Sequence, residues 1–152
     1  MVDLEVQTKM KIGNVEIKNK LILAPLAGYT NQVYREICHD LGAALTYTEM
    51  ISDKGLLYEN EKTWDLCFIK EEERPVSLQL FGGNIEEMVK AAKLIDERSN
   101  CDIIDINMGC PVKKVLKSGS GSYLIQDTKY LEQMVRSVVD NVSKPVTVKV
   151  RI

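Results

Sequence analysis

The stretch Asp105-Ile106-Asn107-Met108-Gly109-Cys110-Pro111 has the pattern of a buried strand that ends in a tight turn. Asp105 and Asn107 are two residues apart, so both side chains leave the strand on the same face. Gly109 allows the chain to turn sharply, and Pro111 prevents the strand from continuing. Polar groups are costly to bury unless they are hydrogen-bonded or functional. The stretch therefore predicts an active-site strand end with a thiol, Cys110, just beyond it.

Predicted strands and helices alternate on both sides of this stretch. Asn31, Asn84 and Asp127 are expected to cap helices that run to about residues 41, 98 and 142. The first of these helices carries its apolar residues on one face: Val33, Tyr34, Ile37 and Leu41. The other predicted elements are a frayed segment at 1–9, a hairpin at 11–17, strands at 21–27, 45–52, 76–81 and 146–152, and a glycine-rich loop at 113–121. This alternation predicts parallel strands with right-handed crossovers.

Five parallel strands suit either a doubly wound sheet or part of a (β/α)8 barrel, which needs eight strands and about 250 residues. One strand face repeatedly carries polar residues near the C-terminal end: Ser77, Gln79, Asp105, Asn107, Thr147, Lys149 and Arg151. The alternate positions are apolar and are expected to pack under helices: Leu78, Leu80, Ile104, Ile106, Val148 and Val150. Central strands of a doubly wound sheet are apolar on both faces. The predicted fold is therefore α/β, a partial (β/α)8 barrel formed by residues 1–152, with about five parallel strands and an N-terminal hairpin.

Composition narrows the functional classes. Twenty basic and 22 acidic residues give a formal charge of −2, which counts mildly against a nucleic-acid binder. No apolar run reaches the roughly 18–20 residues of a membrane span, and the start lacks the features of a signal peptide, so a cytoplasmic protein without membrane contact is expected. The cysteines Cys38, Cys67, Cys101 and Cys110 lack the spacing of a metal site, so no metal is expected.

Several residues on the polar face have both a functional and a structural interpretation. A free thiol with a pKa of about 8.5 is mostly protonated at neutral pH and suits a general acid, although Cys110 could equally be a small residue buried at a turn. Lys149 and Arg151 could bind an anion or an electron-rich ring, or form a solvated edge. Gln79 could read the edge of a heterocycle, or be a hydrogen-bonded core amide.

Outside that face, the candidates are weaker. The basic cluster of Lys113, Lys114 and Lys117 could meet a phosphate backbone but is more often simply solvated. His39, the only histidine, lies among polar neighbours on a predicted helix and is interpreted as structural. The sequence therefore offers no histidine-based catalytic triad.

Five motifs in order resemble the tRNA-dihydrouridine synthase family. They are Ala24-Pro25-Leu26-Ala27-Gly28-Tyr29-Thr30, Thr48-Glu49-Met50, Gln79-Leu80-Phe81-Gly82, Asn107-Met108-Gly109-Cys110-Pro111 and Lys149-Val150-Arg151. The resemblance extends from about residue 11 to the end, and five motifs in register are highly specific. It departs mildly at Leu26, where methionine is usual, and at Tyr29-Thr30-Asn31, which replaces a more typical Val-Thr-Asp.

The resemblance implies an FMN-binding barrel that reduces the C5–C6 double bond of uridines in tRNA, with NADPH recharging the flavin. By position, Pro25, Leu26 and Ala27 would line the isoalloxazine, while Gln79 and Lys149 would bind its pyrimidine edge. Cys110 would protonate C5 of uracil, and Asn107 and Arg151 would help to hold the flipped-out base or the flavin.

The resemblance also implies later barrel strands, flavin-phosphate loops and a helical tRNA-binding domain that these 152 residues do not include. The chain alone is therefore expected to bind FMN weakly and to turn over poorly, and its open edge could pair with a second copy. Two other functions stay open at this point. One is an FMN barrel acting on free pyrimidines, like a dihydroorotate dehydrogenase, and the other is a non-catalytic remnant that serves as an interaction module.

Overall fold

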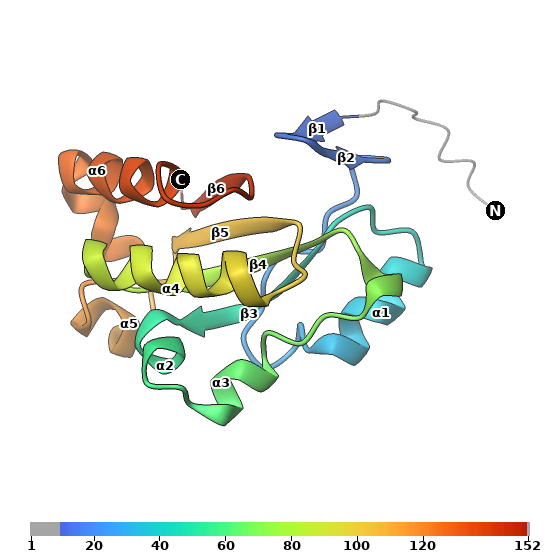
Figure 1. The fold of residues 1–152 in the computed structure, drawn as a ribbon, viewed down its shortest axis with the longest axis horizontal. Helices are drawn as coiled ribbons and strands as arrows, with labels where there is room; N and C mark the ends of the chain where they lie inside the picture. The colour runs from blue at the N-terminus through green and yellow to red at the C-terminus, as the bar shows by residue number, and fades with distance from the viewer. Residues whose placement is uncertain (1–9, 152) are drawn as a thin grey trace.

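A computed structural model describes residues 10–151 of the chain (Figure 1). The predicted frayed segment 1–9, and Ile152 at the end of the predicted last strand, lie outside the described residues. The described elements are β1 (Met10–Ile12), β2 (Val15–Ile17), α1 (Gln32–Asp40), β3 (Thr46–Ser52), α2 (Asp53–Leu57), α3 (Glu61–Asp65), η1 (Glu71–Glu73), β4 (Val76–Phe81), α4 (Ile85–Arg98), β5 (Ile103–Met108), α5 (Lys113–Lys117), η2 (Gly121–Gln126), α6 (Thr128–Val139) and β6 (Val146–Val150).

The main sheet has four parallel strands in the order β3-β4-β5-β6, and the helices α2, α4 and α6 lie side by side across one face (Figure 1). Apolar side chains fill the layer between them, because alternate residues of β4 and β5 point to the helices. Val76, Leu78, Leu80, Ile104 and Ile106 are fully buried there. Burying a side chain of this size stabilises the fold by roughly 1.5–3 kcal/mol. The predicted α/β class and the alternating pattern of these strands are confirmed.

The edge strand β6 departs from the expected pattern. Val146 packs against the core, but Val148 is 40% and Val150 is 48% exposed. The prediction that both valines pack under helices is therefore wrong for the described residues. The reason is geometric: β6 is the edge strand, hydrogen-bonded only to β5 in this sheet, so no further described strand covers its other side. Pairing of this edge with a second copy stays a prediction.

The predicted strand at residues 21–27 is reduced to a short bridged segment. Ile22 forms an isolated parallel bridge with Leu45, supported by hydrogen bonds from Leu23 N to Leu45 O (3.0 Å) and from Ala44 N to Leu21 O (2.9 Å). Pro25 has no N–H to donate, and the chain turns immediately after it. The segment nevertheless lies beside β3, so the parallel order runs from residue 22 through β3, β4 and β5 to β6, as expected for part of a barrel.

The hairpin β1–β2 lies at the amino ends of the parallel strands, opposite their arrowheads (Figure 1). Ile17 from the hairpin is fully buried against Leu45 and Ile103 in a second apolar cluster. The turn lies at Gly13, whose φ of +59° favours glycine. The hairpin therefore closes the end of the sheet that is farthest from the polar strand ends.

Polar caps begin the three longest helices where the sequence predicts them. Asn31 Oδ1 accepts from Tyr34 N at 3.0 Å, Asn84 Oδ1 accepts from Glu87 N at 3.0 Å, and Asp127 Oδ1 accepts from Tyr130 N at 3.0 Å. Each bond satisfies a backbone donor in the first helical turn. Helix α4 ends at Arg98 as expected, whereas α6 ends at Val139, before the predicted residue 142.

Helix α1 buries its polar face and exposes its apolar one. Its predicted apolar residues are all exposed: Val33 (60%), Tyr34 (43%), Ile37 (50%) and Leu41 (79%). The residue of α1 that is buried is Arg35. In the described part of the chain, therefore, an ion pair rather than apolar contact holds the inner face of this helix.

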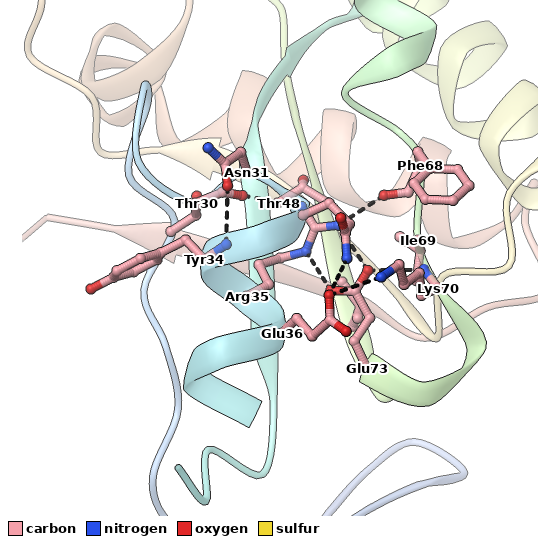
Figure 2. Close-up of polar contacts among 12 residues, drawn as sticks. Thr30, Asn31, Tyr34, Arg35, Glu36, Thr48, Phe68, Ile69, Lys70 and Glu73 are labelled. Carbon is pink, nitrogen blue, oxygen red and sulfur yellow. Dashed lines mark hydrogen bonds and ion pairs between the residues drawn. The ribbon is translucent and has the colours of Figure 1, made fainter. Parts of the chain in front are cut away.

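That ion pair joins Arg35 to Glu73 of η1 (Figure 2). Arg35 Nε lies 3.0 Å from Glu73 Oε2, and Arg35 Nη2 lies 3.1 Å from Glu73 Oε1. The guanidinium also donates to the carbonyls of Phe68 (2.8 Å) and Thr30 (3.1 Å). Glu73 Oε1 accepts in addition from Lys70 N at 2.9 Å. The pair ties α1 to the segment before β4 and to the turn at residues 26–30.

Candidate active site

A cavity of about 540 Å³ opens at the C-terminal ends of the strands, where active sites of (β/α)8 barrels lie. The structure brings all eight residues to which the family resemblance gives a role to this one cavity. Its walls are formed by Pro25, Leu26, Ala27, Met50, Gln79, Asn107, Gly109, Cys110, Pro111, Lys149, Val150 and Arg151. The volume lies within the usual range of about 300–1,000 Å³ for small-molecule sites.

The wall formed by Pro25, Leu26 and Ala27 is held by the turn that follows it. Thr30 is fully buried, and its hydroxyl lies 3.1 Å from both the N and the O of Leu26. Gly28 N donates a hydrogen bond to the Glu49 carboxylate of β3. These contacts fix an apolar, gently turned surface against which a flat ring can lie.

A bulge in β3 changes the direction of the side chains in the second half of this strand. The pairing with β4 moves from Tyr47↔Ser77 to Met50↔Gln79, so β3 has one residue more than β4 over this interval. A bulge of this kind redirects side chains next to a site. Here the Thr48 hydroxyl accepts from Gln79 N at 3.1 Å, and Met50 joins the cavity wall.

A chain of hydrogen bonds crosses the floor of the cavity from β6 to the turn after β5. Asp105 accepts from the Thr147 hydroxyl and from Gln79 Nε2, each at 2.6 Å. Gln79 Oε1 accepts from Asn107 Nδ2 at 2.9 Å. Asn107 Oδ1 in turn accepts from the backbone N–H groups of Gly109 (3.2 Å) and Cys110 (3.0 Å). The polar pair of β5 is therefore hydrogen-bonded and also connected to the thiol-bearing turn.

Burial raises the pKa of the Asp105 carboxyl, against the hydrogen bonds from Gln79 and Thr147 and the positive charge of Lys149. Lys149 is exposed in the cavity wall, on β6 beside Asn107 of β5. Arg151 donates from Nε to the carbonyl of Gly109 at 3.1 Å, which joins the ends of β6 and β5. The cavity thus combines an apolar wall, an amide edge, two cations and a thiol.

The backbone carbonyl of Cys110 is held by the start of η2, which approaches it closely. Ser122 donates to Cys110 O from both its N (3.0 Å) and its hydroxyl (3.2 Å). Gly121 has a φ of +64°, and a Cβ there would lie 2.5 Å from Cys110 O, so only glycine fits. Cys110 is half-buried and forms part of the cavity wall.

Comparison with known proteins decides the family. A sequence model described as "Dihydrouridine synthase (Dus)" matches residues 22–152. This chain belongs to the dihydrouridine synthase family. Its relatives include tRNA-dihydrouridine synthase B of Vibrio vulnificus, 42% identical over 93% of this chain and 44% of that protein. The corresponding Escherichia coli K12 protein is 39% identical over 93% and 44%, and a probable tRNA-dihydrouridine synthase of Aquifex aeolicus is 40% identical over 89% and 43%.

The chain spans less than half the length of these curated relatives. Membership of the dihydrouridine synthase family identifies the parallel sheet as part of a barrel. The five motifs that carry the resemblance lie along the strands and turns described above. Each of them contributes at least one residue to the cavity wall, and the Thr48-Glu49-Met50 motif contributes Met50.

The weaker candidates of the sequence lie outside the cavity of this dihydrouridine synthase chain. Lys113, Lys114 and Lys117 are exposed on the short helix α5, so the prediction of a continuous loop at 113–121 is wrong at residues 113–117. Lys114 lines a neighbouring hollow that shares Ala27 and Met50 with the cavity. His39 lies on α1, 3.7 Å from Asp40.

Within residues 10–151, no group of three or more His, Cys, Asp or Glu side chains is arranged to hold a metal ion. None of the helices in the same range has the length and apolar character that crossing a membrane requires.

Three residues that shape the site have no individual role in the sequence prediction. Met50 belongs to a motif, but the bulge that brings it to the cavity wall has no local sequence signal. The strand pattern places Asp105 and Thr147 on the correct face but does not show that they are hydrogen-bonded to each other. Their spacing on adjacent parallel strands, Asp105 opposite Thr147, was the available signal, and it needed the strand register to be read.

Proposed function

We propose that this chain is the N-terminal, catalytic-face part of a flavin-dependent tRNA-dihydrouridine synthase, which reduces the C5–C6 double bond of uridines in tRNA. The observation that carries the proposal is the convergence of Cys110, Gln79 and Lys149 on one cavity with an apolar wall. The relatives, which are more than twice as long as this chain, are named tRNA-dihydrouridine synthase B, and their names support the same activity.

The donor set of the cavity fits the isoalloxazine ring of FMN. Pro25, Leu26 and Ala27 supply an apolar surface for the ring face. Gln79 keeps one N–H and one carbonyl lone pair beyond its contacts with Asp105 and Asn107, and these can pair with a ring edge that has both donors and acceptors. Bound FMN, reduced by NADPH, would supply the hydride.

The residues of the chain would supply the remaining chemistry. The Cys110 thiol gives its proton to C5 of uracil, and the thiolate regains a proton from solvent. Lys149 would hold a positive charge beside the flavin ring and so stabilise the negative charge of its reduced form. Asn107 and Arg151 would position the base, which must leave the RNA stack to reach this cavity. Arg151 retains guanidinium N–H groups beyond its bond to Gly109 O.

The test uses the purified 152-residue chain, FMN and tRNA that lacks dihydrouridine. FMN titration followed by absorbance should give weak binding, because the flavin-phosphate contacts are expected in later parts of the longer protein. At saturating FMN and NADPH, dihydrouridine should form slowly in tRNA and not from free uracil or orotate. Activity on free pyrimidines alone would favour the dihydroorotate dehydrogenase-like alternative. No flavin binding at any concentration would favour the non-catalytic one.

Replacing Lys149 with methionine should lower the midpoint potential of bound FMN. Loss of the cation destabilises the negatively charged reduced form, and about 30 mV corresponds to each ~1.4 kcal/mol lost in a two-electron couple. The potential is measured by spectroelectrochemical titration at saturating flavin. Lys129→Met, which removes an exposed charge on α6, is the matched control and should leave the potential unchanged. Equal potentials for both variants would contradict the role given to Lys149.

A further inference from the structure

The side chain of Asp105 is 1% exposed, and both of its oxygens accept hydrogen bonds inside the protein. It has no direct role in the proposed chemistry, because its neighbours Gln79 and Asn107 lie between it and Cys110. A buried carboxylate that does not touch the reacting groups needs a physical reason, since burying its charge is costly.

The reason lies in the direction of the hydrogen bonds. Both oxygens of Asp105 act as acceptors, from the Thr147 hydroxyl and from Gln79 Nε2, so Gln79 turns its NH2 group toward Asp105 and its carbonyl oxygen toward Asn107. Asn107 must then present its own NH2 group to Gln79, which leaves Asn107 Oδ1 for the backbone N–H groups of Gly109 and Cys110. Without a fixed partner, either amide group could rotate and exchange the positions of its NH2 group and its oxygen. The Asp105 carboxylate fixes the orientation of Gln79, and Gln79 then fixes that of Asn107.

We propose that Asp105 is a positioning residue that sets the orientation of both amides and thereby holds the turn that carries the Cys110 thiol. The inference rests on the proposed function only for the task of the thiol. If Asn107 reversed, its NH2 group would face two backbone N–H donors, and the turn would lose its two anchors. Asp105 therefore acts on the turn through two intermediate side chains, those of Gln79 and Asn107.

The Thr147 hydroxyl provides an internal comparison, because it donates to the same carboxylate at 2.6 Å. Thr147→Val removes one hydrogen bond but leaves an acceptor-only group facing Gln79, so the amide orientation should persist. Asp105→Asn keeps the shape but introduces an NH2 group, which allows the reversed network as well as the original one. A residue that mattered only for packing or stability would respond alike to the two changes.

The thiols of the chain give a readout that needs neither FMN nor RNA. Cys110 and Cys38 are half-buried, whereas Cys67 and Cys101 are buried. Burial raises the pKa of Cys67 to about 12 and that of Cys101 to about 11, so both react slowly with alkylating reagents. Cys38 on α1 lies outside the cavity and serves as an internal standard for the rate at Cys110.

The experiment measures iodoacetamide alkylation of each cysteine by mass spectrometry at one fixed pH. Asp105→Asn should raise the rate at Cys110 about three- to tenfold, the scale of one lost hydrogen bond, with Cys38 unchanged. Thr147→Val and the exposed-surface control Asp140→Asn should leave both rates within about twofold. Equal rates at Cys110 in wild type and Asp105→Asn, or equal increases in Asp105→Asn and Thr147→Val, would overturn the proposal.

The wild-type chain offers a second test that does not depend on a variant folding. In nuclear Overhauser spectra, the Asn107 NH2 protons should contact the Met50 side chain, since Nδ2 lies 4.0 Å from Met50 Sδ. Contacts from that NH2 group to the Gly109 and Cys110 amides in its place would show the reversed orientation and overturn the proposal. Because neither test involves catalysis, failure of the proposed tRNA activity leaves both results interpretable.

Discussion

Replacing Cys110 with alanine should lower the rate of dihydrouridine formation about 10²- to 10⁴-fold, the usual contribution of a positioned general acid. The thiol lies in the cavity wall with the amide edge of Gln79 and the cation of Lys149. Removing it takes away the proton donor but leaves the groups proposed to contact the flavin. The loss should therefore appear when reduced flavin is oxidised by tRNA in a single turnover, while flavin reduction by NADPH proceeds at the wild-type rate.

Two variants make this result specific to the proton. Cys38→Ala removes the other half-buried thiol, on α1, and should leave both half-reactions unchanged. Cys110→Ser keeps a hydroxyl at the same position, but a hydroxyl is a much weaker acid, so its rate should fall between those of wild type and alanine. A Cys110→Ala chain that forms dihydrouridine as fast as wild type would remove this thiol from the mechanism.

Replacing Glu73 with glutamine should lower the free energy of unfolding by about 3–5 kcal/mol. The change leaves the Arg35 guanidinium, whose side chain is 1% exposed, without its charged partner in the interior (Figure 2). Domains of this size are stable by only about 5–15 kcal/mol, so the loss is a large part of the total. The measurement is urea unfolding of the chain at fixed pH, with the slope checked for constancy.

The neighbouring exposed pair supplies the control. Lys70 and Glu36 lie 2.9 Å apart, but both side chains are about two-fifths exposed (Figure 2). Glu36→Gln should therefore lower the free energy of unfolding far less than Glu73→Gln, because solvent screens an exposed ion pair. The double change Arg35→Met with Glu73→Leu should recover most of the stability, because it removes both charges. Equal effects of Glu73→Gln and Glu36→Gln would show that burial does not strengthen the inner pair.

The exposed apolar face of α1 shows where local patterning gives an incomplete answer. The spacing of Val33, Tyr34 and Ile37 correctly predicts an amphipathic helix, and Asn31 correctly predicts its start. The spacing does not say which face the described chain buries. The partners of Arg35 come from η1, from residue 68 and from the turn at residue 30, and no local pattern encodes a contact between residues 38 positions apart.

The sequence predicts more of the cavity lining than of the packing of α1, because parallel strands place their C-terminal ends together. Polar residues at the ends of β4, β5 and β6 were sufficient to gather Gln79, Asn107, Cys110, Lys149 and Arg151. The bulge in β3, the early end of the segment at 21–27 and the exposure of Val148 and Val150 could not be anticipated, since each depends on pairing or cover from a neighbouring segment.

The sequence by itself determined the α/β class, the helix starts and the set of residues at the strand ends, because periodicity, capping and chain turns are local properties. Only the tertiary structure decided that Asp105, Gln79 and Asn107 form the middle of a directed hydrogen-bond chain from Thr147 to Cys110. The direction of that chain depends on which acceptor meets which donor across three strands. Such a meeting is set by register, and register is fixed only when the strands have paired.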